Sequence, residues 1–166
     1  MSHGDAMNLQ RQVNHALDDE HHASLDLMHQ VEACMQSGGV RAPEFARIAA
    51  ALARHIERDI GRHFDFEEQE LFPRLEAAGE GDIVGLLIEE HVAIREVAAE
   101  LLPRLHSVAA GTLDTAGGDA LKRGVLEMAE RLVAHIHMET TVLLPMLDDH
   151  IDDETDRALA LSYAAT

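Results

Sequence analysis

Apolar residues recur at spacings of three and four along most of the chain, which is the pattern of amphipathic helices. Near the C-terminal end, for example, Met128, Leu132 and Met146 belong to one such stripe. No alternation of apolar and polar residues, as a half-buried strand would require, extends over a useful length. Aromatic residues make up only 3% of the chain, so the core must consist mainly of Leu, Ile, Val, Ala and Met. We therefore predict an all-α fold.

Glycine-rich breaks divide this pattern into four long segments. We predict helices over residues 9–35, 43–78, 82–110 and 119–148. Asp82 and Asp119 are the expected N-caps of the last two. Because short loops between long helices make neighbours antiparallel, we expect an up-down-up-down four-helix bundle. Residues 1–8 are expected to be a flexible N-terminus, and the acidic segment 149–166 to form a short extra helix.

Charge and cysteine content narrow the classes of function. The chain carries 13 basic and 31 acidic residues, a net charge of −18, which disfavours binding to nucleic acid or to an anionic membrane. No apolar segment approaches the roughly 20 residues needed to cross a bilayer, and the first residues do not resemble a signal peptide. The single cysteine, Cys34, excludes an intramolecular disulfide and a cysteine metal cage. We expect a buried thiol and a cytoplasmic protein.

An internal repeat points to specific chemistry. His63-x-x-x-Glu67 is followed 72 residues later by His135-x-x-x-Glu139, and each pair precedes a Leu-x-Pro-x-Leu segment in the same register. Side chains four residues apart lie one turn apart on the same face of a helix. Each segment therefore offers an imidazole nitrogen and a carboxylate to the same point in space.

The apolar stripes place both pairs at core positions, and they place one histidine of each remaining helix there as well. Asp19-Glu20-His21 aligns with Glu89-Glu90-His91 at an offset of 70, close to that of the first repeat, so the chain resembles a doubled helical hairpin. His55 lies one step off its stripe and is expected at the periphery. Burying two carboxylates without partners costs several kcal/mol each. Since a cation satisfies all of these groups at once, we predict a metal site.

Counting ligands indicates what kind of site this is. If Glu67 and Glu139 bridge two ions and the four histidines are shared two per ion, each ion gains four protein ligands. A bridging oxide or hydroxide adds a fifth, so an octahedral ion keeps one open position. Ligation by nitrogen and oxygen without thiolate suits iron or manganese, with zinc possible. The only tyrosine, Tyr163, lies in the C-terminal tail, so we expect no tyrosine near the site, which disfavours radical chemistry.

These residues resemble the hemerythrin-like family of HHE cation-binding domains over about residues 9–147. The resemblance implies a four-helix bundle that holds two non-haem iron ions with oxo or hydroxo and carboxylate bridges. Carried over by position, the metal ligands are His21, His63, Glu67, His91, His135 and Glu139. The oxygen-carrying members have a second histidine where this chain has Arg95, and an aspartate five residues after the fourth-helix histidine instead of Glu139 at four. These departures disfavour a dedicated oxygen carrier.

We therefore expect a protein that binds or senses O₂, NO or peroxide at the open coordination position. A di-iron redox enzyme that removes peroxide or NO or oxidises ferrous iron is an alternative, as is a protein for iron storage or delivery. The expected partners are metal ions and a small diatomic or peroxide ligand, while a protein partner stays open. Arg95 has two possible roles, contact with a bound anion or a surface ion pair with Glu96 or its neighbours.

Overall fold

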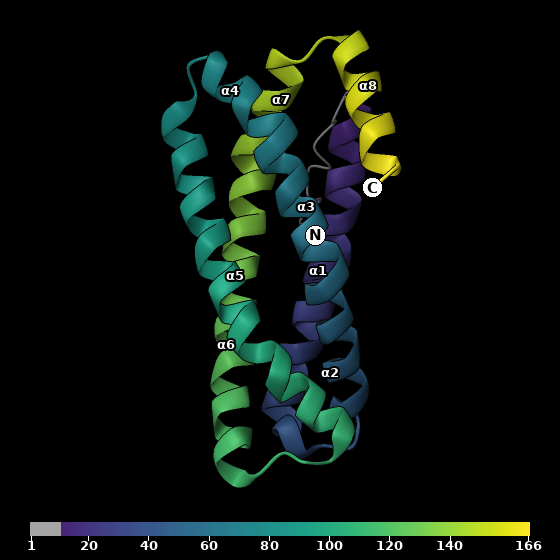
Figure 1. The fold of residues 1–166 in the computed structure, drawn as a ribbon, viewed down its shortest axis with the longest axis vertical. Coiled ribbons are helices and arrows are strands. Elements are labelled where there is room, and N and C mark those ends of the chain that lie inside the picture. Colours follow the sequence, from purple (N-terminus) through teal and green to yellow (C-terminus); the bar gives the residue numbers. More distant parts are fainter. Residues whose placement is uncertain (1–10) are drawn as a thin grey trace, which may run out of the picture.

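A computed structural model describes residues 11–166, and this part of the chain contains helices and no strand. The predicted flexible segment 1–8 and the predicted first helical residue, Leu9, lie outside the described residues. Four long helical arms form an elongated bundle, and a fifth helix lies against one end of it (Figure 1). The predicted all-α four-helix bundle with an extra C-terminal helix is confirmed. None of the described helices is both long and apolar enough to cross a membrane.

The first and third arms are single α-helices, α1 (Gln12–Ser37) and α5 (Gly81–Ala110). The other two arms contain π-helical turns. The second arm consists, in chain order, of α2 (Phe45–Arg54), η2 (His55–Ile60), α3 (Gly61–Phe66), η3 (Glu67–Leu71) and α4 (Phe72–Ala77). The fourth consists of α6 (Thr115–Met138), η4 (Glu139–Leu143) and α7 (Leu144–His150). A short 3₁₀ turn, η1 (Gly39–Arg41), joins the first two arms, and α8 (Asp153–Ala164) follows the fourth.

Two of the π turns occupy equivalent places in the two His-x-x-x-Glu segments. Each begins at the glutamate of its segment and ends two residues before a proline, Pro73 or Pro145. The backbone N–H of Phe72 bonds to the carbonyl of Glu67, five residues back, and Leu144 does the same with Glu139. Proline lacks an N–H and crowds the preceding turn of an α-helix. A wider turn before it relieves that crowding, so both arms continue past the glutamates instead of ending there.

Both predicted N-caps are wrong. The fourth arm begins at Thr115, because Asp114 accepts a hydrogen bond from the N–H of Gly117 at 2.7 Å and caps the helix. Gly117 and Gly118 indicate a loop by composition, yet they lie in the first turn. A Cβ on Gly118 would lie 3.0 Å from the guanidinium of Arg41, so glycine makes room for that side chain. The third arm begins at Gly81, with Glu80 at the cap position and Asp82 in the first turn.

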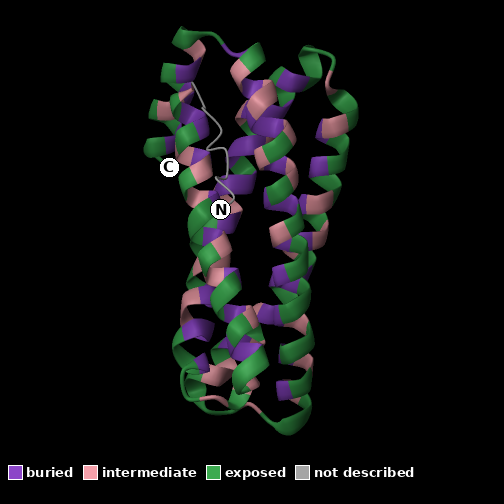
Figure 2. Ribbon diagram, turned by 180° about the vertical axis from the view of Figure 1, so that it is seen from behind, coloured by how far each residue is buried: buried purple, intermediate pink, exposed green. Residues whose placement is uncertain are grey.

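The apolar interior is divided into two clusters, one toward each end of the bundle. The first contains Met28, Leu52, Ile94 and Leu132 among others, and the second contains Leu17, Leu71, Leu87 and Leu143 among others. Buried residues follow the inward sides of the arms and exposed residues the outer sides (Figure 2). Along each arm, the change from one cluster to the other coincides with buried histidine or glutamate residues. A polar layer therefore crosses the middle of the bundle.

Helix α8 is part of this architecture. It packs along α1, and its buried residues include Leu159 and Tyr163. Asp156 of α8 accepts hydrogen bonds from the backbone N–H groups of Gln12 and Val13 at 2.9 and 3.0 Å. These groups belong to the first turn of α1, which has no side-chain cap of its own. The C-terminal helix thus completes the start of the first helix.

Candidate metal centre

All six residues predicted as metal ligands lie together in the polar layer. Each is at most 7% exposed, and they come from all four arms: His21, His63, Glu67, His91, His135 and Glu139. The helical periodicity of the sequence therefore predicted correctly that these side chains point inward. Cys34 is also buried, as expected, and lies in the first apolar cluster, outside this layer.

Glu139 lies between two pairs of histidines. Its Oε2 atom is 2.7 Å from Nε2 of His21 and 3.6 Å from Nε2 of His63. Its Oε1 atom is 2.6 Å from Nε2 of His135 and 3.6 Å from Nε2 of His91. Each carboxylate oxygen therefore faces a different histidine pair, which is the arrangement that a bridging carboxylate requires.

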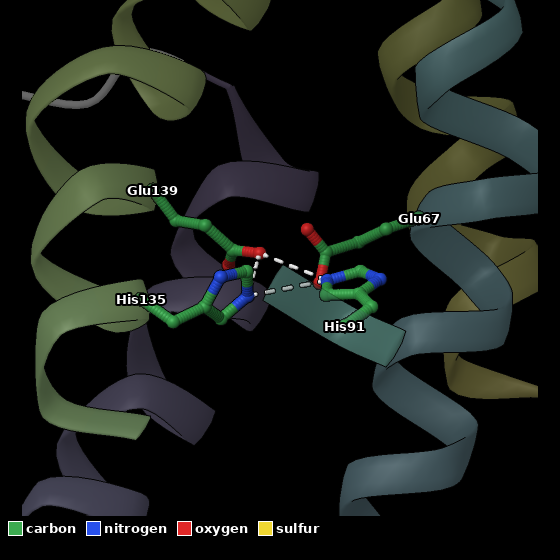
Figure 3. Close-up of side chains that lie close together, drawn as sticks. All are labelled: Glu67, His91, His135 and Glu139. Carbon is green, nitrogen blue, oxygen red and sulfur yellow. Dashed lines mark hydrogen bonds and ion pairs between the residues drawn. The ribbon is translucent and has the colours of Figure 1, made fainter. Parts of the chain in front are cut away.

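Glu67 enters the site from the opposite side (Figure 3). Its Oε1 atom is 2.8 Å from Nε2 of His63 and 3.9 Å from Nε2 of His91, one histidine of each pair. The Nε2 atoms of His91 and His135 are 3.2 Å apart. Within the described residues, two groups have ligand atoms close enough to hold an ion: Glu67 with His91, His135 and Glu139, and His21 with His63 and Glu139. Glu139 belongs to both groups.

The hydrogen bonding of these carboxylates fits a cation. Both oxygens of Glu67 and Oε1 of Glu139 are buried without a hydrogen bond of suitable geometry, although an imidazole nitrogen lies close to Oε1 of each residue. A buried carboxylate without partners costs several kcal/mol. A metal ion would use these lone pairs and the Nε2 atoms together, so the residues present suit a metal.

The pKa values of the polypeptide show how the charges are divided without a cation. Burial and the neighbouring Glu139 raise the pKa of Glu67 to about 8. Burial also acts to raise the pKa of Glu139, but His135, His21 and His63 outweigh it and hold this pKa well below its usual value. Burial opposes the charge on His135, and Glu139 and Glu90 overcome it and raise its pKa to about 10. Without a cation, the raised pKa values of Glu67 and His135 thus favour protonation of these two groups.

Three of the four histidines are oriented by carboxylates behind them. Nδ1 of His63 donates to Glu20 at 2.8 Å, Nδ1 of His91 to Glu68 at 2.8 Å, and Nδ1 of His135 to Glu90 at 2.6 Å. Such bonds fix the tautomer and leave Nε2 free for a metal. Among the described residues, Nδ1 of His21 has the hydroxyl of Thr140 as its partner, at 3.5 Å, in place of a carboxylate. We call these three carboxylates, of Glu20, Glu68 and Glu90, the outer layer. The sequence analysis did not predict it.

The repeat contained a signal for this outer layer. Glu20 and Glu90 precede His21 and His91, and each bonds across the bundle to the histidine of a His-x-x-x-Glu pair. The two residues therefore recur because they have the same role in each half. Sequence reasoning used them only to align the halves.

Arg95 acts on the outer layer. It forms ion pairs with Glu68 at 2.6 Å and Asp65 at 2.9 Å, so an ion pair is present, but with the second arm instead of with Glu96 or its neighbours. Burial acts to raise the pKa of Glu68, and Arg95 and His91 reverse this and lower it. Arg95 therefore keeps Glu68 charged beside His91.

The expectation that no tyrosine lies near the site is wrong. Tyr163 is 4% exposed and donates a hydrogen bond to Glu20, and its hydroxyl is 3.4 Å from Nδ1 of His63. The tail position in the sequence was misleading because α8 turns back along α1 and brings its last turn to the outer layer. Linear distance from the motifs gave no indication of this.

His55 also differs from expectation, since it is not peripheral. Its side chain is 11% exposed, with Nε2 2.8 Å from the hydroxyl of Ser24 and Nδ1 3.0 Å from Asp59. It is the first residue of the π segment η2. The helical pitch changes there, whereas the predicted position of His55 assumed a regular α-helix. Ser24 and His55 line a cavity of about 20 Å³, together with His21, His63, His135 and Glu139. That volume is room for about one water molecule.

Residues 12–147 match the model of the hemerythrin HHE cation-binding domain. The chain belongs to this family. The predicted resemblance is confirmed, and the HHE family together with the buried cluster of histidine and glutamate makes this a metal-binding protein. Comparison with curated proteins gives no significant match, and neither does comparison with solved structures.

Proposed function

We propose that this HHE protein holds two iron ions and binds O₂, NO or peroxide at one of them. The ligands are His21 and His63 for one ion and His91 and His135 for the other, with Glu67 and Glu139 shared between the two. We call the first the His21/His63 position and the second the His91/His135 position. An oxo or hydroxo bridge would complete the centre, whose iron would supply an open position and redox chemistry.

The observation that carries the proposal is the placement of Glu139. Its two oxygens face two separate histidine pairs, and it belongs to both groups able to hold an ion. A single ion would leave one histidine pair and one buried carboxylate oxygen without a partner. Two ions use every inward Nε2 atom and both oxygens. Ligation by nitrogen and carboxylate oxygen, without a thiolate, suits iron.

The cavity supports the choice of a small ligand. Its lining includes both His21 and His63, with His135 from the other pair, and its volume of about 20 Å³ leaves room for a molecule of one or two heavy atoms. Its wall includes the Ser24 hydroxyl and the His55 imidazole, which can hydrogen-bond to a polar ligand. We therefore assign the ligand to the His21/His63 position.

The test is metal analysis of protein purified without oxygen, followed by optical spectra on addition of O₂, NO and peroxide. Two iron ions per chain and a new absorption band with at least one ligand are expected. A reversible band indicates binding, whereas catalytic loss of peroxide with an unchanged final spectrum indicates a redox enzyme. A chain that binds one ion, or none, contradicts the two-ion centre.

A further inference from the structure

Tyr163 stands out among the residues that the proposed function does not use. Its ring is buried against Phe66, with ring centroids 4.6 Å apart, and the guanidinium of Arg62 lies 4.8 Å from the ring centroid. It is the only tyrosine in the sequence, which has no tryptophan. A phenylalanine would fill the same apolar space, so the hydroxyl needs its own explanation.

The hydroxyl is joined to the candidate centre by a single carboxylate. Tyr163 donates to Oε2 of Glu20, and the same oxygen accepts from Nδ1 of His63 at 2.8 Å. Arg62 forms an ion pair with the other oxygen of Glu20, which keeps this carboxylate in place. The remaining ring nitrogen of His63 faces Glu67 and Glu139. A continuous path of hydrogen bonds thus runs from the phenol to a proposed iron ligand.

This environment disfavours simple ionisation of the phenol. Burial and the carboxylate of Glu20 raise the pKa of Tyr163, so the hydroxyl stays protonated at neutral pH. Oxidation changes this, because a phenol that has lost an electron is a far stronger acid than a carboxylic acid. Glu20, already hydrogen-bonded to the hydroxyl, is placed to take the proton at the moment the electron leaves.

We propose that Tyr163 is a one-electron donor to the metal centre, with hydrogen peroxide as the oxidant. The step rests on the proposed function and starts from a half-oxidised centre, which can give up only one electron. Peroxide takes that electron and a second from Tyr163, its O–O bond breaks, and two water molecules form. The tyrosine proton passes to Glu20 and stays there, and the two protons that the water molecules require come from solvent. The products are an oxidised centre and a neutral tyrosyl radical.

The experiment uses the iron-loaded full chain, reduced by one electron per centre, mixed with stoichiometric peroxide and frozen for electron paramagnetic resonance. An organic radical signal is expected. Because Tyr163 is the only tyrosine, growth on ring-deuterated tyrosine assigns the signal without any mutation: the hyperfine pattern must narrow. Tyr163→Phe, with its iron content unchanged, must lose the signal. A centre reduced by two electrons is the matched control and must give less radical, since it supplies both electrons itself.

The outcomes separate this proposal from the proposed function. Normal iron content and peroxide consumption without a radical would overturn the role of Tyr163 and leave the two-ion centre standing. A signal that does not narrow with deuterated tyrosine, or that survives in Tyr163→Phe, would also overturn it. A chain that takes up no iron overturns both proposals, and metal analysis before freezing identifies that case.

Discussion

The two proposed ion positions are built from similar ligands but have different surroundings. At the His91/His135 position, both histidines are held by carboxylates, and the ring of Phe64 stacks on His91 with centroids 3.7 Å apart. At the His21/His63 position, the described residues place a carboxylate behind His63 and none behind His21, and both of these histidines line the cavity, whereas His135 alone does so from the other position. Tighter orientation of ligands strengthens metal binding. We therefore expect the first position to hold its ion more firmly and the second to be where ligands bind.

The largest expected effect comes from removing what the two positions share. Glu139→Ala removes a ligand from both, so we expect both ions to be lost under conditions in which the wild-type chain keeps two. Glu130→Ala is the matched control, since Glu130 is an exposed glutamate of the same arm. Metal analysis after gel filtration measures the difference. A Glu139→Ala chain that still holds one firmly bound ion would show that the carboxylate is not shared.

Removing the metal should lower the free energy of unfolding of the bundle and reverse the direction in which this free energy changes with pH. The metal-free bundle buries carboxylates without a cation, so we expect its free energy of unfolding to fall by several kcal/mol. The raised pKa values of Glu67, about 8, and His135, about 10, mean that the folded metal-free chain binds more protons than the unfolded chain. Its stability should therefore fall as the pH rises from about 6.5 to 8.5.

In the metal-loaded protein, the opposite trend is expected over this range, because metal binding needs deprotonated ligands and strengthens as the pH rises. Denaturant unfolding of both forms at pH 6.5, 7.5 and 8.5 measures the two slopes. Slopes of the same sign would contradict the assignment of these buried groups to the metal.

A smaller and one-sided effect is expected from the outer carboxylates. Glu90→Gln removes the charge behind His135 and should weaken the ion at the His91/His135 position about 10- to 100-fold. Glu20→Gln should do the same at the His21/His63 position through His63. Each variant is the control for the other. Competition with a chelator, read from the loss of each ion, measures both affinities, and equal loss of both ions in both variants would remove the distinction between the positions.

The smallest effect is expected at the cavity. Ser24→Val adds bulk to its wall and removes the hydroxyl that bonds to His55, so binding of cyanide, as an anionic probe of two heavy atoms, should weaken while the iron content stays the same. Ser37→Val, at the exposed end of α1, is the control. An optical titration with cyanide gives both affinities. Unchanged affinity in Ser24→Val would place the ligand elsewhere.

The sequence was sufficient to predict the bundle and the inward position of the six candidate ligands. The reason is that helix periodicity and the repeated His-x-x-x-Glu segment are local patterns. The side chains that they put on one face of each helix are the ones that pack inside the bundle. The helix starts were not predictable in the same way. Asp114 caps the fourth arm through the N–H of Gly117, and Arg41, far away in the chain, bonds to the carbonyl of Asp114 at 3.1 Å and fills the space beside Gly118.

The surroundings of the site were the least predictable part. The apolar stripe in the sequence predicts side-chain positions on the assumption of constant α-helical pitch, and the π segment that begins at His55 has a different pitch. Tyr163 reaches the site only because α8 packs back along α1, which no spacing within the tail indicates. The bonds from Glu20 and Glu90 cross the bundle, so the repeat showed that these residues correspond without showing what they contact.

The polar layer that separates the two apolar clusters has a consequence for cooperativity. Each cluster packs mainly within itself, and the histidines and glutamates between them are the main groups that belong to neither. With metal bound, six ligands from all four arms would tie the two ends into one folding unit. Without it, the ends should open separately. Native-state hydrogen exchange would then find one protection level in the loaded protein and two in the metal-free protein.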